Sequence, residues 1–322
     1  MSDRHDPGSN PIRDGGQAVF VGAITFDTIA LVASAPGPDE RVVADQICSA
    51  GGGPAATAAV AAARLGVSSA VIGAVGDDDE GRRALDGLRQ EGVDTQGVAV
   101  VPGRQTQASL VVVHAASGTR TICTRAVPPL QLDGGPAVRD LLAGATWVHA
   151  DHLGWPAVRA LGLRRGGTRL SVDAGNPVPG LAPADVDLFV PTLEALERSY
   201  GRRSPQQLLD AAIEDGAGTV VATRGADGSL AATSDGQRAE APGHPVDVCS
   251  TLGAGDVFHG ALVAAMVHGL PLPRALHYAN VAAALSCRGL DGRSAIPTHD
   301  EVQAVLPHAP SPHPLTTLGG HP

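Results

Sequence analysis

Apolar runs typical of β-strands alternate along this chain with runs rich in alanine, leucine and arginine that have helical periodicity. We expect strands at 18–21, 69–72, 147–149, 169–173, 188–191 and 219–222, and helices at 54–65, 80–91 and 156–163. Strands separated by helices imply βαβ units, in which parallel strands form a sheet that helices cover on both faces. The predicted fold class is therefore α/β, a doubly wound and largely parallel sheet flanked by helices.

Two segments interrupt this alternation, because their apolar runs have no helix between them. Antiparallel strand pairs are predicted for 28–32 with 41–48, and for 108–114 with 120–125. The two pairs, spanning about 28–48 and 108–125, predict a small β-lid over a substrate site. An extension of the edge of the main sheet is the alternative interpretation.

The predicted folded domain spans residues 18–306 and shows no convincing internal repeat. Residues 1–17 are rich in glycine, aspartate and proline, and residues 307–322 mix proline, histidine and glycine without periodicity. Both ends are predicted to be disordered tails, since neither offers the apolar surface that a packed core needs.

Composition and charge narrow the class of partner. The chain has 322 residues, of which 43% are hydrophobic and 17% charged, as in globular proteins. Its net charge of −10 argues against nucleic acid, which requires clustered basic residues, and favours a small neutral or polar substrate. All 23 basic residues are arginine, which excludes Schiff-base chemistry and a phosphate loop built on lysine.

The cysteines and the apolar segments indicate where in the cell the protein is found. Cys48, Cys123, Cys249 and Cys287 are scattered, without a Cys-x-x-Cys pair, so neither a zinc cluster nor a disulfide framework is indicated. No apolar run has the length of a membrane span, and the first residues do not resemble a signal peptide. We therefore predict reduced cysteines, no membrane partner and a cytoplasmic location.

A turn of small residues runs directly into an apolar helix near residue 253. The backbone N–H groups of Gly253, Ala254 and Gly255 would be free at the positive end of that helix, where they could hold a phosphate. Asp256 would follow in the first turn, placed to take a proton from a bound hydroxyl. A loop followed by an acidic N-terminal residue, with no catalytic role, is the alternative.

A second glycine-rich segment precedes the helix predicted at 54–65. Gly51, Gly52 and Gly53 are followed by Pro54 and by a run of alanines with Thr57. Such small residues bring the backbone unusually close to a neighbour, which would be either a ligand or an adjacent element of the fold.

Together these two segments resemble the two signatures of the ribokinase-like (PfkB) carbohydrate kinase family, the first at 51–66 and the second at 250–261. Three further segments occur in the order that this family shows: Asp27, the stretch 223–228 and the run 282–298. The resemblance therefore covers essentially all of the predicted domain. It implies an ATP-dependent sugar kinase that uses Mg²⁺, with the metal held chiefly by phosphate oxygens and water.

The resemblance also implies residue roles. Asp256 would be the general base, and Gly253 to Gly255 the anion hole for the transferred phosphoryl group. Positions matched to sugar binding are Asp27, Gly52, Gly53 and Thr57, with Asp151 as an acidic residue near the sugar. Positions matched to the nucleotide are Thr223, Gly225, Gly228 and Asn280.

Three positions depart from the family pattern. Ser250 stands where an aspartate associated with a monovalent cation site is usual, so the resemblance does not extend to activation by K⁺. Thr57 replaces the asparagine usual in the first signature, so the resemblance does not fix which sugar hydroxyl it meets, directly or through water. The usual Asn-x-x-Glu near the phosphates and metal is not intact, which leaves Glu194 and Glu197 as alternative metal-site candidates.

The wording of both signatures is closest to the branch with ketohexokinase-like and sulfofructose kinases, which favours a ketose or a sugar acid as acceptor. Arg120 and Arg125 lie on the predicted lid, where a guanidinium could hold an anionic substituent, or simply form a solvated face. A nucleoside kinase of the same fold and a catalytically silent sugar-binding protein are the alternatives. A homodimer through the exposed lid strands is also predicted.

Overall fold

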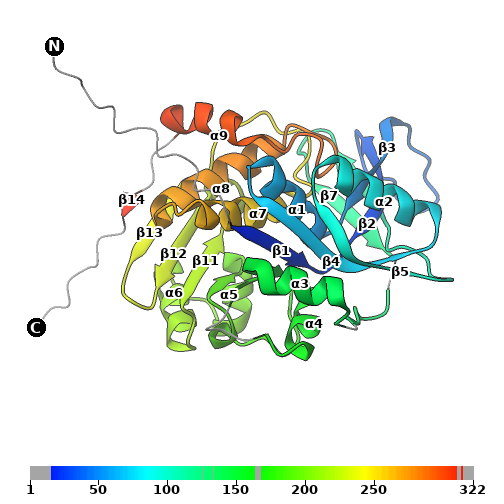
Figure 1. The fold of residues 1–322 in the computed structure, drawn as a ribbon. Coiled ribbons are helices and arrows are strands. Elements are labelled where there is room, and N and C mark those ends of the chain that lie inside the picture. The colour runs from blue at the N-terminus through cyan, green and yellow to red at the C-terminus, as the bar shows by residue number, and fades with distance from the viewer. Residues whose placement is uncertain (1–15, 126, 133, 164–167, 310–312, 315–322) are drawn as a thin grey trace, which may run out of the picture.

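One large β-sheet forms the centre of the fold (Figure 1). The computed structural model describes residues 16–125, 127–132, 134–163, 168–309 and 313–314. The ten strands of the sheet lie in the order β14 (His313–Pro314), β13 (Arg238–Ala241), β12 (Ser229–Thr233), β11 (Thr219–Thr223), β10 (Leu188–Val190), β9 (Arg169–Asp173), β8 (Ala145–Ala150), β1 (Gln17–Val21), β4 (Ser68–Gly76) and β5 (Asp94–Val101). From β11 to β5 every pairing is parallel, and only β11 to β14 pair antiparallel.

Helices cover both faces of this sheet (Figure 1). One face carries α1 (Pro54–Arg64), α2 (Asp79–Gln90), α7 (Ala254–Val267) and α8 (Leu272–Ser286), with α9 (His299–Val305) beyond them. The other face carries α3 (Pro136–Gly144), α4 (Gly154–Ala160), α5 (Leu193–Tyr200) and α6 (Pro205–Glu214). Short 3-10 turns add η1 (Pro183–Asp185), η2 (Gly225–Asp227) and η3 (Leu306–His308). The predicted α/β, doubly wound fold class is confirmed.

The helix layer over the first face is packed through small side chains. A Cβ at Gly260 of α7 would lie 2.2 Å from the carbonyl oxygen of Ala58 in α1, so the two helices approach to backbone contact. Alanines fill most of the buried positions of α1 for the same reason. Within the described residues, no helix is both long and apolar enough to cross a membrane.

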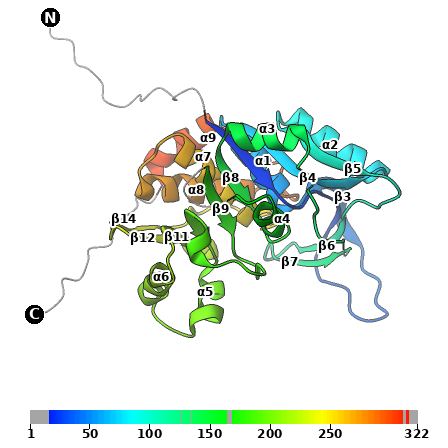
Figure 2. The same cartoon turned by 60° about the horizontal axis from the view of Figure 1, so that its bottom comes forward.

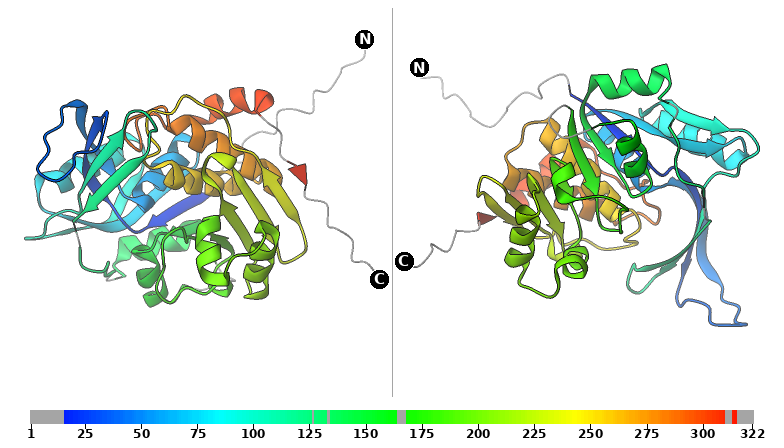
Figure 3. Two further views of the ribbon diagram at one scale, coloured as in Figure 1. Left: turned by 180° about the vertical axis from the view of Figure 1, so that it is seen from behind. Right: turned by 90° about the horizontal axis from the view of Figure 1, so that it is seen from below.

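A second, four-stranded sheet forms the lid. Its strands lie in the order β3 (Ala44–Gly52), β2 (Thr25–Val32), β6 (Ser109–His114) and β7 (Arg120–Thr124). Both predicted pairs are antiparallel, and a parallel pairing of β2 with β6 joins them into one sheet. This sheet is separate from the main one and projects from one end of the α/β body (Figure 2 and Figure 3). On its inner face Ile29, Val111 and Val113 pack against Leu290.

Several bounds differ from the sequence-based expectation. Strand β3 continues past Cys48 to Gly52, because its pairing with β2 runs on as far as Thr25. Strand β5, helix α3 and the β12–β13 hairpin were not predicted at all, since their sequences mix small, polar and charged residues without clear period. Beyond residue 306, η3 and the pairing of β14 with β13 lie within the expected tail, whereas residues 1–15 and 315–322 lie outside the described residues.

The topology indicates where a site should lie. Chain connections run from β1 towards β4 on one side, while β8 lies on the other side of β1. In open α/β sheets, ligands bind at the carboxyl ends of strands where the direction of winding reverses in this way. The glycine-rich start of α1 and the segment that follows β1 both come to this edge, as does the end of β8.

The contact between α1 and α7 makes a stability prediction. Gly260→Ala would place a methyl group against a backbone carbonyl, so we expect the free energy of unfolding to fall by about 1–3 kcal/mol. Gly87→Ala in α2 is the matched control, because a Cβ there meets nothing within 4 Å and should stabilise the helix by about 0.5–1 kcal/mol. Urea unfolding of both variants measures the difference; equal effects would contradict the packing argument.

Candidate active site

The start of α7 presents backbone donors to an anion. Gly253 precedes the helix with a left-handed φ of 75°, and a Cβ there would lie 2.8 Å from the Cα of Gly292. Only glycine satisfies both demands. Because the first N–H groups of a helix lack intrahelical acceptors, Gly253 and Gly255 offer backbone donors at a positive helix end, whereas the Ala254 N–H donates to the Thr251 carbonyl at 3.3 Å. A Cβ at Gly255 would meet nothing within 4 Å, so the approach is open.

Asp256 lies half-buried in the first turn of α7. Burial raises the pKa of its carboxyl group to about 7, and the neighbouring carboxylates of Asp173 and Asp151 add to the rise. The positive charges of His259 and Arg120 act in the opposite direction. A carboxyl group with a pKa near neutrality is suited to taking up a proton from a substrate hydroxyl at physiological pH.

A buried polar cluster lies beneath Asp256. His259, one turn further along α7, places Nε2 3.2 Å from Oδ1 of Asp173 at the end of β9. The ring of His149 lies 5.2 Å from the ring of His259, centroid to centroid, and its Nδ1 is 3.0 Å from the hydroxyl of Ser171. These side chains come from β8, β9 and α7, which meet under the helix start.

The acceptor side of the site begins with Asp27 on the lid strand β2. Its Oδ2 accepts a hydrogen bond of 2.9 Å from the Thr25 hydroxyl, and its Oδ1 accepts one of 2.7 Å from the Ser109 N–H. A Cβ at Gly52, which pairs opposite Thr25, would lie 2.2 Å from Oδ2 of Asp27. Glycine at 52 therefore makes room for the carboxylate, whose pKa burial raises.

Arg293, from a distant part of the chain, holds the first glycine-rich segment in place. Its side chain is buried, with its Nη2 donating to the Gly52 carbonyl at 2.6 Å and its Nε donating to Oγ1 of Thr57 at 3.2 Å. Burial lowers the pKa of the guanidinium to about 10, an effect that the charges of Asp27 and Asp256 oppose. Arg293 therefore stays a cation at neutral pH and feels both the acceptor-side aspartate and the candidate base.

Asp151 is placed differently from the expectation. It is fully buried, and its two carboxylate oxygens accept hydrogen bonds from four backbone N–H groups, those of Ala23, Ala55, Leu153 and Gly154. These donors occupy the acceptor positions of the carboxylate, so none is left for a sugar hydroxyl. The predicted sugar contact is therefore not supported; Asp151 fixes the starts of α1 and α4, beside Gly53, whose φ of 93° needs glycine.

The two lid arginines lie in different places. Arg120 of β7 donates through Nη1 to Oγ1 of Thr251 at 3.1 Å, in the turn that leads to α7. The same turn is held to the lid by the N–H of Thr251, which donates to the Gly118 carbonyl. Arg125 is exposed, and its Nη1 donates to the Thr106 carbonyl at 2.9 Å. Of the two arginines, Arg120 is therefore the one that contacts the turn before α7, and its positive charge acts on Asp256.

The residues matched to the nucleotide form one cluster at the end of β11. Thr223 ends that strand, and Gly225 begins the η2 turn with a φ of 58° and open space around its Cβ position. A Cβ at Gly228 would lie 2.2 Å from the carbonyl oxygen of Ala241. Asn280 of α8 donates to that same carbonyl at 2.9 Å. Asn280 therefore holds the loop around η2 in place.

The remaining sequence-based candidates are positions considered for binding a metal or a monovalent cation. Ser250 is fully buried, and its hydroxyl accepts a hydrogen bond of 3.1 Å from the Leu252 N–H, which shapes the turn before Gly253. On α5, Glu194 is exposed and Glu197 is half-buried one turn later. Within the described ranges, no group of three or more His, Cys, Asp or Glu side chains is arranged to hold a metal ion.

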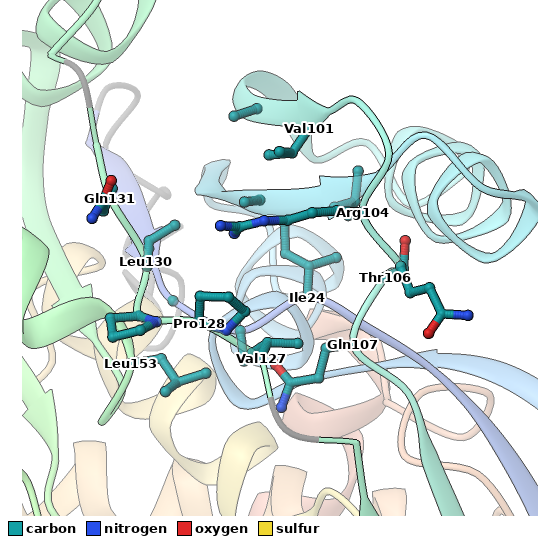
Figure 4. A pocket seen from close by; sticks show the side chains of 17 residues that line it. Ile24, Val101, Arg104, Thr106, Gln107, Val127, Pro128, Leu130, Gln131 and Leu153 are labelled. Carbon is teal, nitrogen blue, oxygen red and sulfur yellow. The ribbon is translucent and has the colours of Figure 1, made fainter.

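A cavity of about 220 Å³ lies next to the acceptor side, at the carboxyl ends of β1, β4 and β5 (Figure 4). Ile24, Pro128 and Leu130 line it with apolar surface, and Arg104 and Gln107 add polar groups. Ile24 and Gln107 adjoin the strands that carry Asp27 and Ser109, so the cavity borders the acceptor site without including its carboxylate.

Sequence reasoning missed three charged residues of this site, Arg293, Asp173 and His259. The spacing of His259, three residues after Asp256 on a predicted helix, was a usable signal, because residues i and i+3 lie on one helix face. Arg293 follows Gly292 in a polar stretch without periodicity, and Asp173 simply ends a predicted strand. Neither of these two offered a comparable pattern.

A doubly wound sheet, a β-lid and an aspartate at a glycine-rich helix start together define a sugar kinase of the ribokinase-like class. The model of the pfkB family carbohydrate kinases matches residues 16–150 and 178–299. This chain belongs to the pfkB family of carbohydrate kinases, and its activity is that of an ATP:sugar phosphotransferase.

The chain is similar to individual members along almost its whole length. It is 31% identical to an ATP-dependent ribose-1-phosphate kinase of Halopiger xanaduensis, over 90% of this chain and 98% of that protein. The structure of Arabidopsis thaliana ribokinase with ribose and ATP superposes with a TM-score of 0.75, at 22% identity over 91% of this chain and 98% of that one. The structure of an Escherichia coli ribokinase II with ATP and Mg²⁺ superposes with a TM-score of 0.72. The two sequences are 20% identical, over 91% of this chain and 99% of that one.

Gly255→Ala tests the anion-binding turn directly. No protein atom lies near the added methyl group, so we expect an unchanged melting temperature, whereas a phosphoryl group approaching the turn would be displaced. A displacement of about 1 Å costs on the order of 100-fold in rate. Gly253→Ala is the contrast, because its methyl group meets Gly292 and should lower stability as well. Full activity of a stable Gly255→Ala variant would contradict the assignment.

Proposed function

We propose that this kinase transfers the γ-phosphoryl group of ATP to a sugar hydroxyl that is deprotonated by Asp256. The observation that carries the proposal is the position of Asp256, in the first turn of α7 and directly after the backbone donors of Gly253 and Gly255. Within the described part of the chain, no hydrogen-bond donor occupies its carboxylate. A hydroxyl bound there would face the base and the anion hole at once.

The acceptor is proposed to lie between the lid and the first glycine-rich segment. This region contains Asp27, Gly52 and Thr57. Arg293 donates hydrogen bonds to Gly52 and Thr57, and its positive charge interacts with Asp256, the proposed base. Asp27 has a fixed orientation, so it can accept from a sugar hydroxyl with little loss of conformational freedom. Arg120 would close the site from the lid, because it already contacts the turn before α7.

ATP is proposed to bind along the cluster of Thr223, Gly225, Gly228 and Asn280. The residues fit such a ligand: the open space at Gly225 leaves backbone accessible, and Asn280 holds the neighbouring loop. Mg²⁺ would neutralise charge on the transferring phosphates, and Glu194 or Glu197 would contribute to its surroundings through water. Such a site needs few protein ligands, because phosphate oxygens and water complete the octahedron.

The acceptor class is proposed to be a ketose or a sugar acid. The relative from Halopiger xanaduensis is named for ribose 1-phosphate, which is also an anionic sugar. Arg293, and Arg125 if its guanidinium leaves the Thr106 carbonyl, are the cations that would meet a negative substituent. Because ATP is an intracellular substrate and all four cysteines are unpaired, we also propose a cytoplasmic location.

Asp256→Asn tests the base. We expect turnover to fall about 10²- to 10⁴-fold, because the amide cannot take the proton, while the KM values for sugar and ATP change little. Asp140→Asn, an exposed change on α3, is the matched control and should keep full activity. A coupled assay of ATP consumption with ketoses, sugar acids, sugar phosphates and nucleosides identifies the acceptor. Undiminished turnover of Asp256→Asn with the best acceptor would contradict the proposal.

The outer face of the lid favours a homodimer. Ile47 on β3 and Leu110 on β6 are 68% and 53% exposed, and Ala30 and Val112 lie between them on the same face. Apolar area of this kind, on a sheet with two open edges, is typical of an association surface. Two lids would then cover each other.

Light scattering coupled to size-exclusion chromatography tests this assembly. We expect a mass of two chains for the natural protein and of one chain for Ile47→Asp, because a carboxylate would be desolvated in the contact. Val100→Asp is the matched control, since Val100 is 52% exposed on β5, outside the lid, and its change should leave the dimer intact. A single-chain mass for the natural protein would rule the dimer out.

A further inference from the structure

The pair of Asp173 and His259 under the candidate base forms a fixed and buried unit. Its contact is 3.2 Å between Oδ1 of Asp173 and Nε2 of His259. The same carboxylate oxygen accepts a hydrogen bond of 2.9 Å from the Gly175 N–H, which holds Asp173 at the end of β9. His259 is 6% exposed. The rings of Phe258 and His149 lie at 6.1 and 5.2 Å from its ring, so it has little freedom to move.

The two members of the pair hold opposite charges. Burial by itself would drive a proton off His259, yet the charge and hydrogen bond of Asp173 raise the pKa of His259 above its ordinary value. In turn, His259 holds the pKa of Asp173 well below its ordinary range, although burial acts against this. His149, with a pKa lowered to about 3 by burial, is neutral at any working pH. These opposed shifts favour an imidazolium at His259 beside a carboxylate at Asp173.

We infer that His259 is a positioning residue for catalysis: it cancels the charge of Asp173, and thereby keeps the neighbouring Asp256 ionised and ready to accept the sugar proton. This inference rests on the proposed role of Asp256 as the base. An uncompensated Asp173 would be a second carboxylate in the same low-dielectric surroundings, and like charges placed so close hold protons on one another. The imidazolium opposes that effect without touching the substrate.

Other charges also face Asp256, and they are not altered by changes in the pair. Asp151 at the end of β8 favours the protonated form of Asp256, whereas Arg120 on the lid strand β7 favours the ionised form. Arg293, in the loop after α8, lies close enough to interact with Asp256 as well. The Asp173–His259 pair is distinct because removing His259 alone leaves a net charge beneath the base, whereas removing both members does not.

The test is a charge cycle read from the pH dependence of kcat. His259→Gln retains a hydrogen-bond donor for Asp173 but leaves its charge uncompensated. We expect the acid limb of the kcat profile to move to higher pH by about one unit or more, with activity regained above the shifted limb and the KM values nearly unchanged. Asp173→Asn should move the limb much less, because His259 then loses its raised pKa and both charges disappear.

The decisive variant is the double change Asp173→Asn with His259→Gln. If the pair acts through its charge, adding Asp173→Asn to His259→Gln returns the acid limb towards its natural position, although a second buried residue has been altered. A purely structural role predicts the opposite, a double variant at least as impaired as His259→Gln at every pH. The position of the limb does not depend on the folded fraction, and melting temperatures at each pH measure that fraction separately.

A matched control separates this inference from the proposed function. His149→Asn changes the neutral member of the same cluster and should leave the limb where it is. An unmoved limb in His259→Gln, or a limb that stays shifted in the double variant, would overturn the inference while leaving Asp256 as the base. Full activity of Asp256→Asn would instead overturn the proposed function itself.

Discussion

The close approach of backbone segments around α7 is the constraint on which the site depends. Gly253 lies against Gly292 where the helix begins, and Gly260 lies against the Ala58 carbonyl about two turns later. A side chain at either glycine would push α7 away from α1 and from the carboxyl edge of the sheet. Asp256 would move with the helix, so the small residues of both signatures position the base as well as opening a path to the backbone donors.

Buried charge is the second constraint, and each buried carboxylate except one is compensated. Asp151 is satisfied by backbone N–H groups, Asp173 by His259, and Asp27 by two hydrogen bonds and the nearby charge of Arg293. Because desolvating an unpaired charge is costly, these partners are needed for the crevice to be this enclosed. Asp256 is the exception, and burial together with the nearby carboxylates of Asp173 and Asp151 raises its pKa.

Local patterns were sufficient for most of the fold. The strands at 18–21, 169–173 and 188–191 appear with bounds close to those predicted, since buried parallel strands are continuous apolar runs. Both lid pairs were predicted because each consists of two apolar runs with no helix between them, but the parallel pairing of β2 with β6 was not, because it joins residues far apart in the chain. The β12–β13 hairpin was missed, as its strands are rich in alanine, serine and threonine rather than in large β-branched residues.

The sequence by itself determined the βαβ alternation of the main strands, the glycine turns and the aspartate that follows one of them, because these depend on local conformation and on residue spacing. Only the tertiary structure decided which charges surround that aspartate. Arg293, Asp173 and His259 meet near Asp256 because a strand end, a helix turn and a late loop converge at one edge of the sheet. It also showed that Asp151 is occupied by backbone donors, since contacts between distant segments, unlike turns and helix ends, are set by packing alone.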